Sequence, residues 1–204
     1  IEFSSIKLLT SKKPKIKFSE IEYIDVPEMN LNEYCNFLVK DLYKYFETSH
    51  CLLIQEDSFV VNPNQWKQEY LNYDYIGAPW TKIIQPIKNK NIELKNRVGN
   101  GGFSLRSKNL LSVCKDLDFN NLFKKYSMNN EDVIICHYLF EDMVKKGIKF
   151  APPELAANFS MEHEPTILDY GFNRDQIFGF HGKHLAGYFK KKFIEKLKLE
   201  EIIK

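Results

Sequence analysis

Residues 51–57 read Cys-Leu-Leu-Ile-Gln-Glu-Asp, a short apolar run that ends abruptly in polar residues. Such a run is typical of a central strand buried on both faces of a sheet. In open α/β sheets, ligands bind at the carboxyl ends of strands. Because side chains two apart share a face of a strand, we expect Gln55 and Asp57 to point together and Glu56 to point away.

Strands and helices alternate on both sides of this run. Strand patterns cover 3–10, 21–26, 75–77, 103–106, 148–150 and 177–181, and helix patterns cover 31–46, 109–117, 130–147 and 185 onward. The helix over 31–46 is the best defined, since apolar residues recur every three or four positions after Asn30 as N-cap. Residues 81–97 lack periodicity and are predicted to form a loop. The alternation predicts an α/β domain with a mixed or mostly parallel sheet.

Composition limits the classes of partner. The chain has 204 residues, which suits one domain, and 29 basic against 27 acidic residues give a net charge of +2. This balance does not favour a nucleic-acid-binding surface, and Arg, the better residue for base and phosphate contacts, occurs only at 97, 106 and 174. We therefore expect no nucleic-acid partner.

The cysteines predict a reducing compartment. Cys35, Cys51, Cys114 and Cys136 form no C-x-x-C motif, and each lies within an apolar pattern. Buried free thiols and a cytoplasmic location are therefore expected. No apolar run approaches the roughly 20 residues of a membrane span.

Two segments could contact a phosphate or a metal ion. Asp57 could supply an oxygen ligand to Mg²⁺ or Mn²⁺, or it could simply form a turn. The Gly99–Gly102 segment, Gly-Asn-Gly-Gly, could bring the backbone close to a ligand, or it could be a hairpin turn. It is neither a P-loop nor a dinucleotide fingerprint, because no Gly-Lys-Ser/Thr follows and it leads into a strand.

An acidic pair, Glu131-Asp132, opens the predicted helix over 130–147. The helix dipole favours acids in a first turn, which is a sufficient structural explanation. The similar pair Glu141-Asp142, late in the same helix, has no such support and is read as solvated surface. A carboxylate at a helix start could also act as a general base in a cleft.

A histidine and a tryptophan stand beside turns. His181 lies between glycines after a predicted strand, an unusual place for a core histidine, and could contact a metal ion or a phosphate. Trp80 closes the segment Asp-Tyr-Ile-Gly-Ala-Pro-Trp and is read as exposed. It could stack on a sugar ring or plug the edge of the core.

The chain ends in a Lys-rich amphipathic segment. Lys190–Lys192, Lys196 and Lys198 flank Phe189, Phe193 and Leu197. This pattern is typical of a helix at a membrane surface, and equally of a solvated helix packed on the domain.

Six blocks together resemble a known family. They are Q-E-D-S-F (55–59), D-Y-I-G-A-P-W (74–80), G-N-G-G-F-S-L-R (99–106), N-E-D (130–132), A-P-P-E…F-S-M-E (151–162) and F-G-F-H-G (178–182). In this order they resemble a domain-of-unknown-function family of small proteins similar to GT-A glycosyltransferases, over residues 3 to 184. The resemblance implies a three-layer α/β/α domain at 1–184, followed by the helix at 185–204. Because residues 3–10 resemble the second strand of that fold, its first strand is expected before Ile1.

The resemblance also implies roles for residues. It implies a Mn²⁺ or Mg²⁺ ion held by Asp57 and His181, and catalysis by Asp132 with Glu131, of which Asp132 is the preferred base. The residues implied to contact the nucleotide-sugar donor are Gln55, Asp57, Gly101 and Gly102. Those implied to contact the acceptor are Trp80 and Asp74. Gln55 departs from the D-x-D motif, which has Asp at that position.

Two functions follow as expectations. One is metal-dependent transfer of a sugar from a nucleotide-sugar donor to a hydroxyl acceptor in surface glycan synthesis, with the tail in peripheral contact with a membrane. The other is a non-catalytic module that binds a nucleotide sugar or a glycan, which the Gln at position 55 favours.

Overall fold

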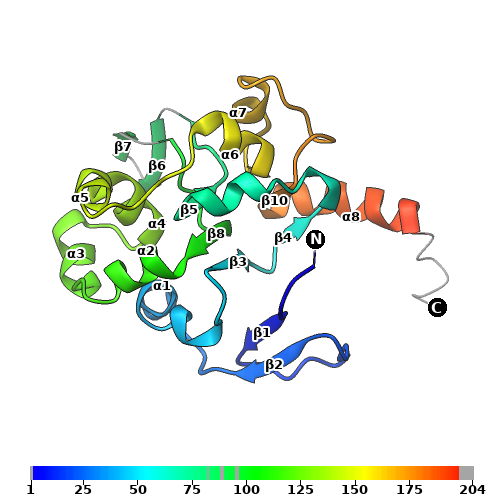
Figure 1. The fold of residues 1–204 in the computed structure, drawn as a ribbon, viewed down its shortest axis with the longest axis horizontal. Helices are drawn as coiled ribbons and strands as arrows, with labels where there is room; N and C mark the ends of the chain where they lie inside the picture. Colours follow the sequence, from blue (N-terminus) through cyan, green and yellow to red (C-terminus); the bar gives the residue numbers. More distant parts are fainter. Residues whose placement is uncertain (1, 82, 88–89, 95–96, 198–204) are drawn as a thin grey trace.

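A three-stranded sheet lies at the centre of the fold (Figure 1). The computed structural model describes residues 2–81, 83–87, 90–94 and 97–197. In this sheet β8 (Phe103–Ser107) lies between β3 (His50–Ile54) and β5 (Tyr75–Gly77) and pairs antiparallel with both. All of β8 is buried, whereas β3 is half-buried and Ile54 is exposed. The prediction that 51–54 is the central buried strand is therefore wrong, because β8 is the central strand. The polar residues Ser104 and Arg106 within β8 make its sequence look unlike a buried strand.

A second sheet joins distant parts of the chain. β10 (Gly179–His181) pairs antiparallel with β4 (Ser58–Val60) and parallel with β9 (Ser160–Met161). In this register His181 lies opposite Ser58, the residue after Asp57. The strand predicted near 177–181 is thus confirmed, and it brings His181 to Asp57.

The α/β class is confirmed, but a mostly parallel central sheet is not seen in the described residues. Beyond the antiparallel pairs of β8, β5 makes one parallel bridge, between Tyr75 and Phe150. The strands β1 (Lys7–Thr10) and β2 (Glu22–Asp25) form a separate parallel pair. An antiparallel pair, β6 (Ile83–Ile87) and β7 (Lys90–Glu93), replaces much of the loop predicted over 81–97. Proline is atypical of a strand interior, so Pro86 within β6 made this strand hard to predict from the sequence. Positions 82, 88–89 and 95–96 of the predicted loop lie outside the described residues.

The predicted helices form with shorter bounds. α1 (Leu31–Lys40) has the expected capping box, in which Asn30 Oδ1 accepts from Glu33 N and Glu33 Oε2 accepts from Asn30 N. The helix predicted over 130–147 is broken into α4 (Glu131–Val133), the π-helical η4 (Ile134–Tyr138) and α5 (Phe140–Lys145). The other helices of the described residues are η1 (Leu42–Tyr45), η2 (Pro63–Gln65), η3 (Gln68–Asn72), α2 (Lys108–Cys114), α3 (Phe119–Tyr126), α6 (Pro153–Phe159), α7 (Glu164–Leu168) and α8 (Lys183–Leu197). The sequence patterns did not predict α3, α6 or α7.

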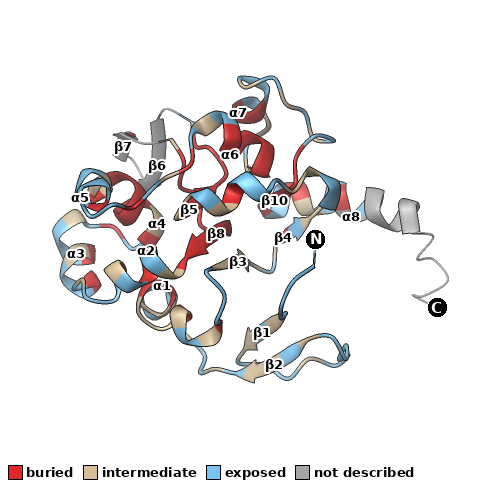
Figure 2. Cartoon of the chain, viewed as in Figure 1, coloured by how far each residue is buried: buried red, intermediate tan, exposed pale blue. Residues whose placement is uncertain are grey.

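Helices cover both faces of the central sheet. Tyr75 packs in one apolar cluster with residues of α2, α3, η4 and α5, whereas its neighbour Ile76 packs in another with Phe159 and Phe178. Since neighbouring strand residues face opposite ways, the two clusters lie on opposite faces of β5. Figure 2 shows the buried residues gathered at β8 and the helices around it.

The C-terminal helix begins as part of the domain. Leu185 and Phe189 of α8 are buried, and the Phe189 ring stacks on Phe180 with 4.6 Å between centroids. Phe189 is therefore engaged in packing rather than free to meet a membrane, while the side chains of Phe193 and Leu197 lie outside the described residues. No described helix has both the length and the apolar character needed to cross a membrane.

The cysteines are free, as predicted. Cys35, Cys114 and Cys136 are buried and Cys51 is half-buried. Burial raises the pKa of the Cys51 and Cys114 thiols to about 12.

Candidate functional site

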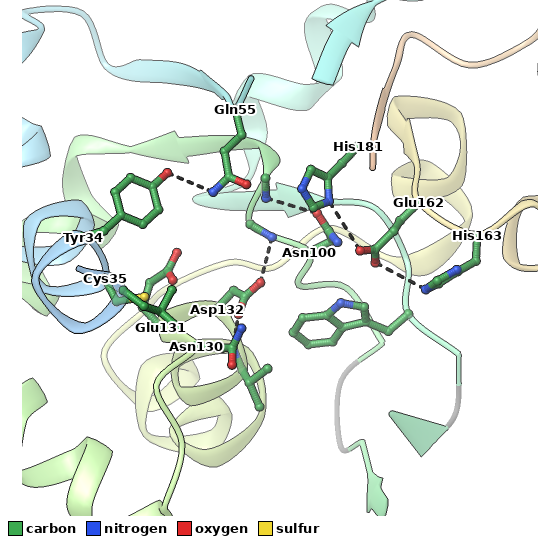
Figure 3. A pocket seen from close by; sticks show the side chains of 15 residues that line it. Tyr34, Cys35, Gln55, Asn100, Asn130, Glu131, Asp132, Glu162, His163 and His181 are labelled. Atoms are coloured by element: carbon green, nitrogen blue, oxygen red, sulfur yellow. Dashed lines mark hydrogen bonds and ion pairs between the residues drawn. The ribbon is translucent and has the colours of Figure 1, made fainter. Parts of the chain in front are cut away.

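A pocket of about 340 Å³ opens between α1, the end of β3, the Gly99–Gly102 segment and the start of α4 (Figure 3). Residues next to β9 and β10 complete its walls. The predicted site residues that line it are Gln55, Trp80, Gly101, Gly102, Glu131, Asp132 and His181. Among the described lining residues there are three carboxylates, Glu131, Asp132 and Glu162, and no Lys or Arg. The pocket is therefore acidic.

The two acids at the start of α4 have different partners. Glu131 Oε1 accepts a hydrogen bond from Arg106 Nη2 at 2.8 Å, and the two side chains are 7% and 0% exposed. Asp132 accepts hydrogen bonds from two backbone donors, Gly101 N on Oδ2 at 2.9 Å and Val133 N on Oδ1 at 2.7 Å. Glu131 is thus committed to an ion pair, and Asp132 is the carboxylate available to a ligand.

Burial gives Asp132 an unusual pKa. Burial is the largest cause and the nearby charge of Glu131 is the second; together they raise the pKa of Asp132 to about 7, although the charge of Arg106 lowers it. A carboxyl group with a pKa near neutrality can exchange a proton at physiological pH. The sequence predicted the acidic pair but not Arg106, which closes the G-N-G-G-F-S-L-R block.

Arg106 also shapes the glycine segment. Its Nε donates to Ser104 Oγ at 3.0 Å, and Ser104 Oγ in turn donates to Gly101 O at 2.9 Å. Arg106 Nη2 lies 3.4 Å from the same Gly101 oxygen. The buried side chains of β8 therefore fix Gly101, whose N–H holds Asp132.

His181 lies between two carboxylates. Its Nε2 is 3.5 Å from Asp57 Oδ1, and its Nδ1 is 3.4 Å from Glu162 Oε1. Burial by itself lowers the pKa of His181, but the contact with Glu162 and the charges of Asp57 and Asp132 outweigh it, so the pKa is raised. Burial likewise raises the pKa of Glu162, but His181, His163 and Asn100 outweigh it and the pKa is lowered.

The Asp57–His181 pair fits part of a cation site. The 3.5 Å between Asp57 Oδ1 and His181 Nε2 is close to the ~3.4 Å between two ligands of one tetrahedral ion, whereas the roughly 3 Å between neighbouring ligands of an octahedral ion would require the two side chains to move slightly closer. Among the described residues no group of three or more His, Cys, Asp or Glu side chains is arranged to hold a metal ion. An ion held by this pair would have one or two protein ligands and would complete its shell with phosphate oxygens and water, as Mg²⁺ and Mn²⁺ can.

The glycines of the segment are required by packing. A Cβ on Gly102 would lie 2.2 Å from the His181 ring, one on Gly101 would lie 2.9 Å from Arg106 Nη2, and one on Gly99 would lie 2.4 Å from the Trp80 ring. None of these three glycines has a positive φ. The backbone of the segment therefore approaches His181, Arg106 and Trp80 closely, while Gly101 and Gly102 also line the pocket.

Trp80 is 5% exposed, so the prediction of an exposed ring is wrong. Its ring packs in the core near Gly99 and Cys136, although the residue still lines the pocket. Trp80 plugs the edge of the core, the alternative that the sequence left open.

Gln55 and Asp57 make contacts with different residues. The chain turns after β3, with Ser58 N donating to Gln55 O, so the strand alternation that would align the two side chains does not apply. Gln55 Nε2 donates to Tyr34 OH at 2.9 Å and joins the end of β3 to α1. Of the two, Asp57 is the one that pairs with His181.

Asp74 lies apart from the pocket. Its Oδ1 accepts from Ser107 Oγ at 2.5 Å and Asn109 Nδ2 at 3.2 Å, and its Oδ2 accepts from Lys149 N at 2.9 Å. These bonds tie together β5, the start of α2 and the segment before Phe150. The structure does not bring Asp74 to the other predicted site residues.

Replacing Asp74 with Ala is expected to lower the free energy of unfolding by about 1–3 kcal/mol, because three donors lose their acceptor. Ligand binding in the pocket should be unchanged. Urea denaturation and nucleotide calorimetry measure the two effects, with the exposed Asp116→Ala as control. Loss of ligand binding without loss of stability would show that Asp74 contacts the ligand.

Comparison with known proteins places the chain in a family. The fold and pocket define a mixed α/β protein with a buried acidic site. The family described as "Protein of unknown function (DUF5672)" matches residues 18–181, and the chain belongs to it. The match spans Asp57, Asp132, Glu162 and His181. No curated protein and no solved structure matches the chain.

Proposed function

We propose that this protein transfers a sugar from a nucleotide-sugar donor to a hydroxyl group of a glycan acceptor. One observation carries the proposal: a single pocket holds Asp132, with a pKa raised to about 7, together with His181, which pairs with Asp57. The resemblance of the sequence blocks to GT-A glycosyltransferase-like proteins supports the same assignment and the α/β/α architecture.

Asp132 is the base in this proposal. Gly101 N and Val133 N hold its carboxylate in place, and a pKa near neutrality suits a group that must accept the proton of an acceptor hydroxyl. Glu131 is hydrogen-bonded to Arg106 and is not assigned the role of base. Its charge contributes instead to the raised pKa of Asp132.

An acidic pocket would need a bound cation in order to accept a negatively charged diphosphate. A diphosphate would meet three carboxylates and no Lys or Arg among the described lining residues. Asp57 and His181 are the residues that would hold Mn²⁺ or Mg²⁺. Such an ion, when bound, supplies positive charge that stabilises a departing nucleoside diphosphate.

The test is calorimetry of nucleoside diphosphates with and without Mn²⁺. We expect binding to the wild type to require Mn²⁺, and Asp57→Ala to weaken it by at least about tenfold. Glu56→Ala is the matched control, since the side chain of this neighbour is exposed and forms a loose ion pair with Lys183, at 3.8 Å. Equal affinity with and without Mn²⁺ would contradict the assignment of Asp57 and His181.

A non-catalytic binding module is the second candidate, and the Tyr34–Gln55 bond favours it. In a two-carboxylate grip the first Asp would face the ion, but here an amide stands at that position and donates to a tyrosine. Metal-independent binding of nucleotide sugars without turnover would support the module over the enzyme.

A further inference from the structure

Each ring nitrogen of His181 faces a different carboxylate. Nε2 faces Asp57 Oδ1 at 3.5 Å, and Nδ1 faces Glu162 Oε1 at 3.4 Å. The three side chains are 18–19% exposed, so water competes little for these contacts. Figure 3 shows Glu162 beside the His181 ring and Asn100 next to both.

A closed set of contacts fixes the ring. The His181 ring lies against Gly102, where a Cβ would clash at 2.2 Å. Gly102 N donates to Asn100 Oδ1 at 3.1 Å, and the side chain of Asn100, which is 4% exposed, also bonds to the Glu162 carboxylate. Glu162 Oε1 in turn lies 3.4 Å from His181 Nδ1, a buried nitrogen, and this is an ion-pair contact rather than a well-formed hydrogen bond. The ring cannot turn over without disturbing Glu162, Asn100 and Gly102 together.

The partner of one histidine nitrogen decides which nitrogen carries the proton in the neutral ring. We propose that Glu162, supported by Asn100, is a positioning residue that keeps the proton of His181 on Nδ1 and leaves the Nε2 electron pair facing Asp57. A carboxylate behind a histidine has this effect in metal sites, where it also strengthens the ligand. The cation's role rests on the proposed function, but the position of the proton does not.

The position of the proton can be measured in metal-free protein. Nitrogen-15 correlation spectra of the imidazole ring, recorded above the pKa of His181, should show Nδ1 protonated and Nε2 unprotonated. Glu162→Ala should move the proton to Nε2, the preferred position in an isolated histidine side chain, while Glu162→Gln, which keeps an acceptor oxygen, should retain part of the wild-type state. Glu56→Ala is the control for loss of a nearby charge, and amide spectra report whether each variant is folded.

The second readout is the affinity for Mn²⁺ alone. Glu162→Ala should weaken it roughly ten- to a hundredfold, with Glu56→Ala close to wild type. A wild-type ring protonated on Nε2, or a proton position or Mn²⁺ affinity that Glu162→Ala leaves unchanged, would overturn the positioning role. If the wild type binds no Mn²⁺ but the proton moves as expected, Glu162 is still the positioning residue and the cation in the proposed function is wrong.

Discussion

Glu131→Ala is expected to lower the free energy of unfolding by about 3–5 kcal/mol, the cost of leaving one partner of a buried ion pair alone. Arg106 is fully buried, and its Nη2 loses the 2.8 Å bond to Glu131 Oε1. Its Nη1 is already buried without a hydrogen-bond partner, and Asp132 is the nearby carboxylate that remains to offset part of the charge. Domains of this kind have about 5–15 kcal/mol of stability, so the variant should fold but unfold at lower urea concentration.

Asp142→Ala is the matched control for this prediction. Asp142 lies 3.6 Å from Lys145, with both side chains more than half exposed, and such pairs contribute less than about 1 kcal/mol. The double variant Arg106→Met/Glu131→Leu should recover much of the loss, because replacing both charges by apolar groups removes the unpaired charge. A cost for Glu131→Ala no larger than that of the control would mean that Glu131 is free for chemistry.

The start of α4 shows what a sequence can and cannot supply. The acidic pair after Asn130 predicted a helix start and a candidate base, and a short helix does begin at Glu131. The choice between the two acids depends on Arg106, which the fold brings to Glu131 although the two residues are 25 positions apart in the chain. The helix itself is interrupted by a bond from Leu139 N to Ile134 O, one residue longer than an α-helical bond, and the apolar spacing does not reveal it.

Burial was the least predictable property of the strands. The apolar run 51–54 resembled a central strand but lies at an edge, while β8 is central although it carries Ser104 and Arg106. A buried strand can hold such residues when their groups are bonded to one another, as Arg106 Nε is to Ser104 Oγ. The pattern of apolar and polar residues within a segment indicates its average hydrophobicity. It does not indicate the side chains, distant in sequence, with which its polar groups form bonds.

The site was predicted in its parts rather than in its arrangement. Asp57 and His181 were each singled out by their position after a strand, and the pairing of β4 with β10 brings them together. Glu162 and Asn100 were missed as site residues although both lie inside the quoted blocks. Asn100 stands out as an amide among glycines, whereas Glu162 lies in the largely polar run Met-Glu-His-Glu, and its contact with His181 becomes visible only in the fold.

Asp132→Asn is expected to reduce sugar transfer by about 10²- to 10⁴-fold, because the amide cannot accept the proton of the acceptor hydroxyl. The wild-type rate should rise with pH until about 7 and then level off, since only the charged carboxylate acts as a base. The residual rate of the variant should lack this dependence. Initial rates with a donor that the wild type uses measure both effects, and a variant with full activity would remove Asp132 from the mechanism.

The same group makes an opposite prediction for stability, which needs no substrate. Because the pKa of Asp132 is raised from 3.8 to about 7 on folding, the folded protein binds more protons than the unfolded chain between these values, so stability falls as pH rises through this range. Asp132→Asn loses one backbone acceptor at every pH but should gain stability relative to the wild type from pH 4 to above 7, by up to about 1.4 kcal/mol per pH unit. Urea denaturation at several pH values measures the difference. If the difference in stability does not change with pH, Asp132 serves only to anchor Gly101. If the difference grows as pH rises, the ionised Asp132 carboxylate destabilises the fold, and this same carboxylate is the group available to accept a proton.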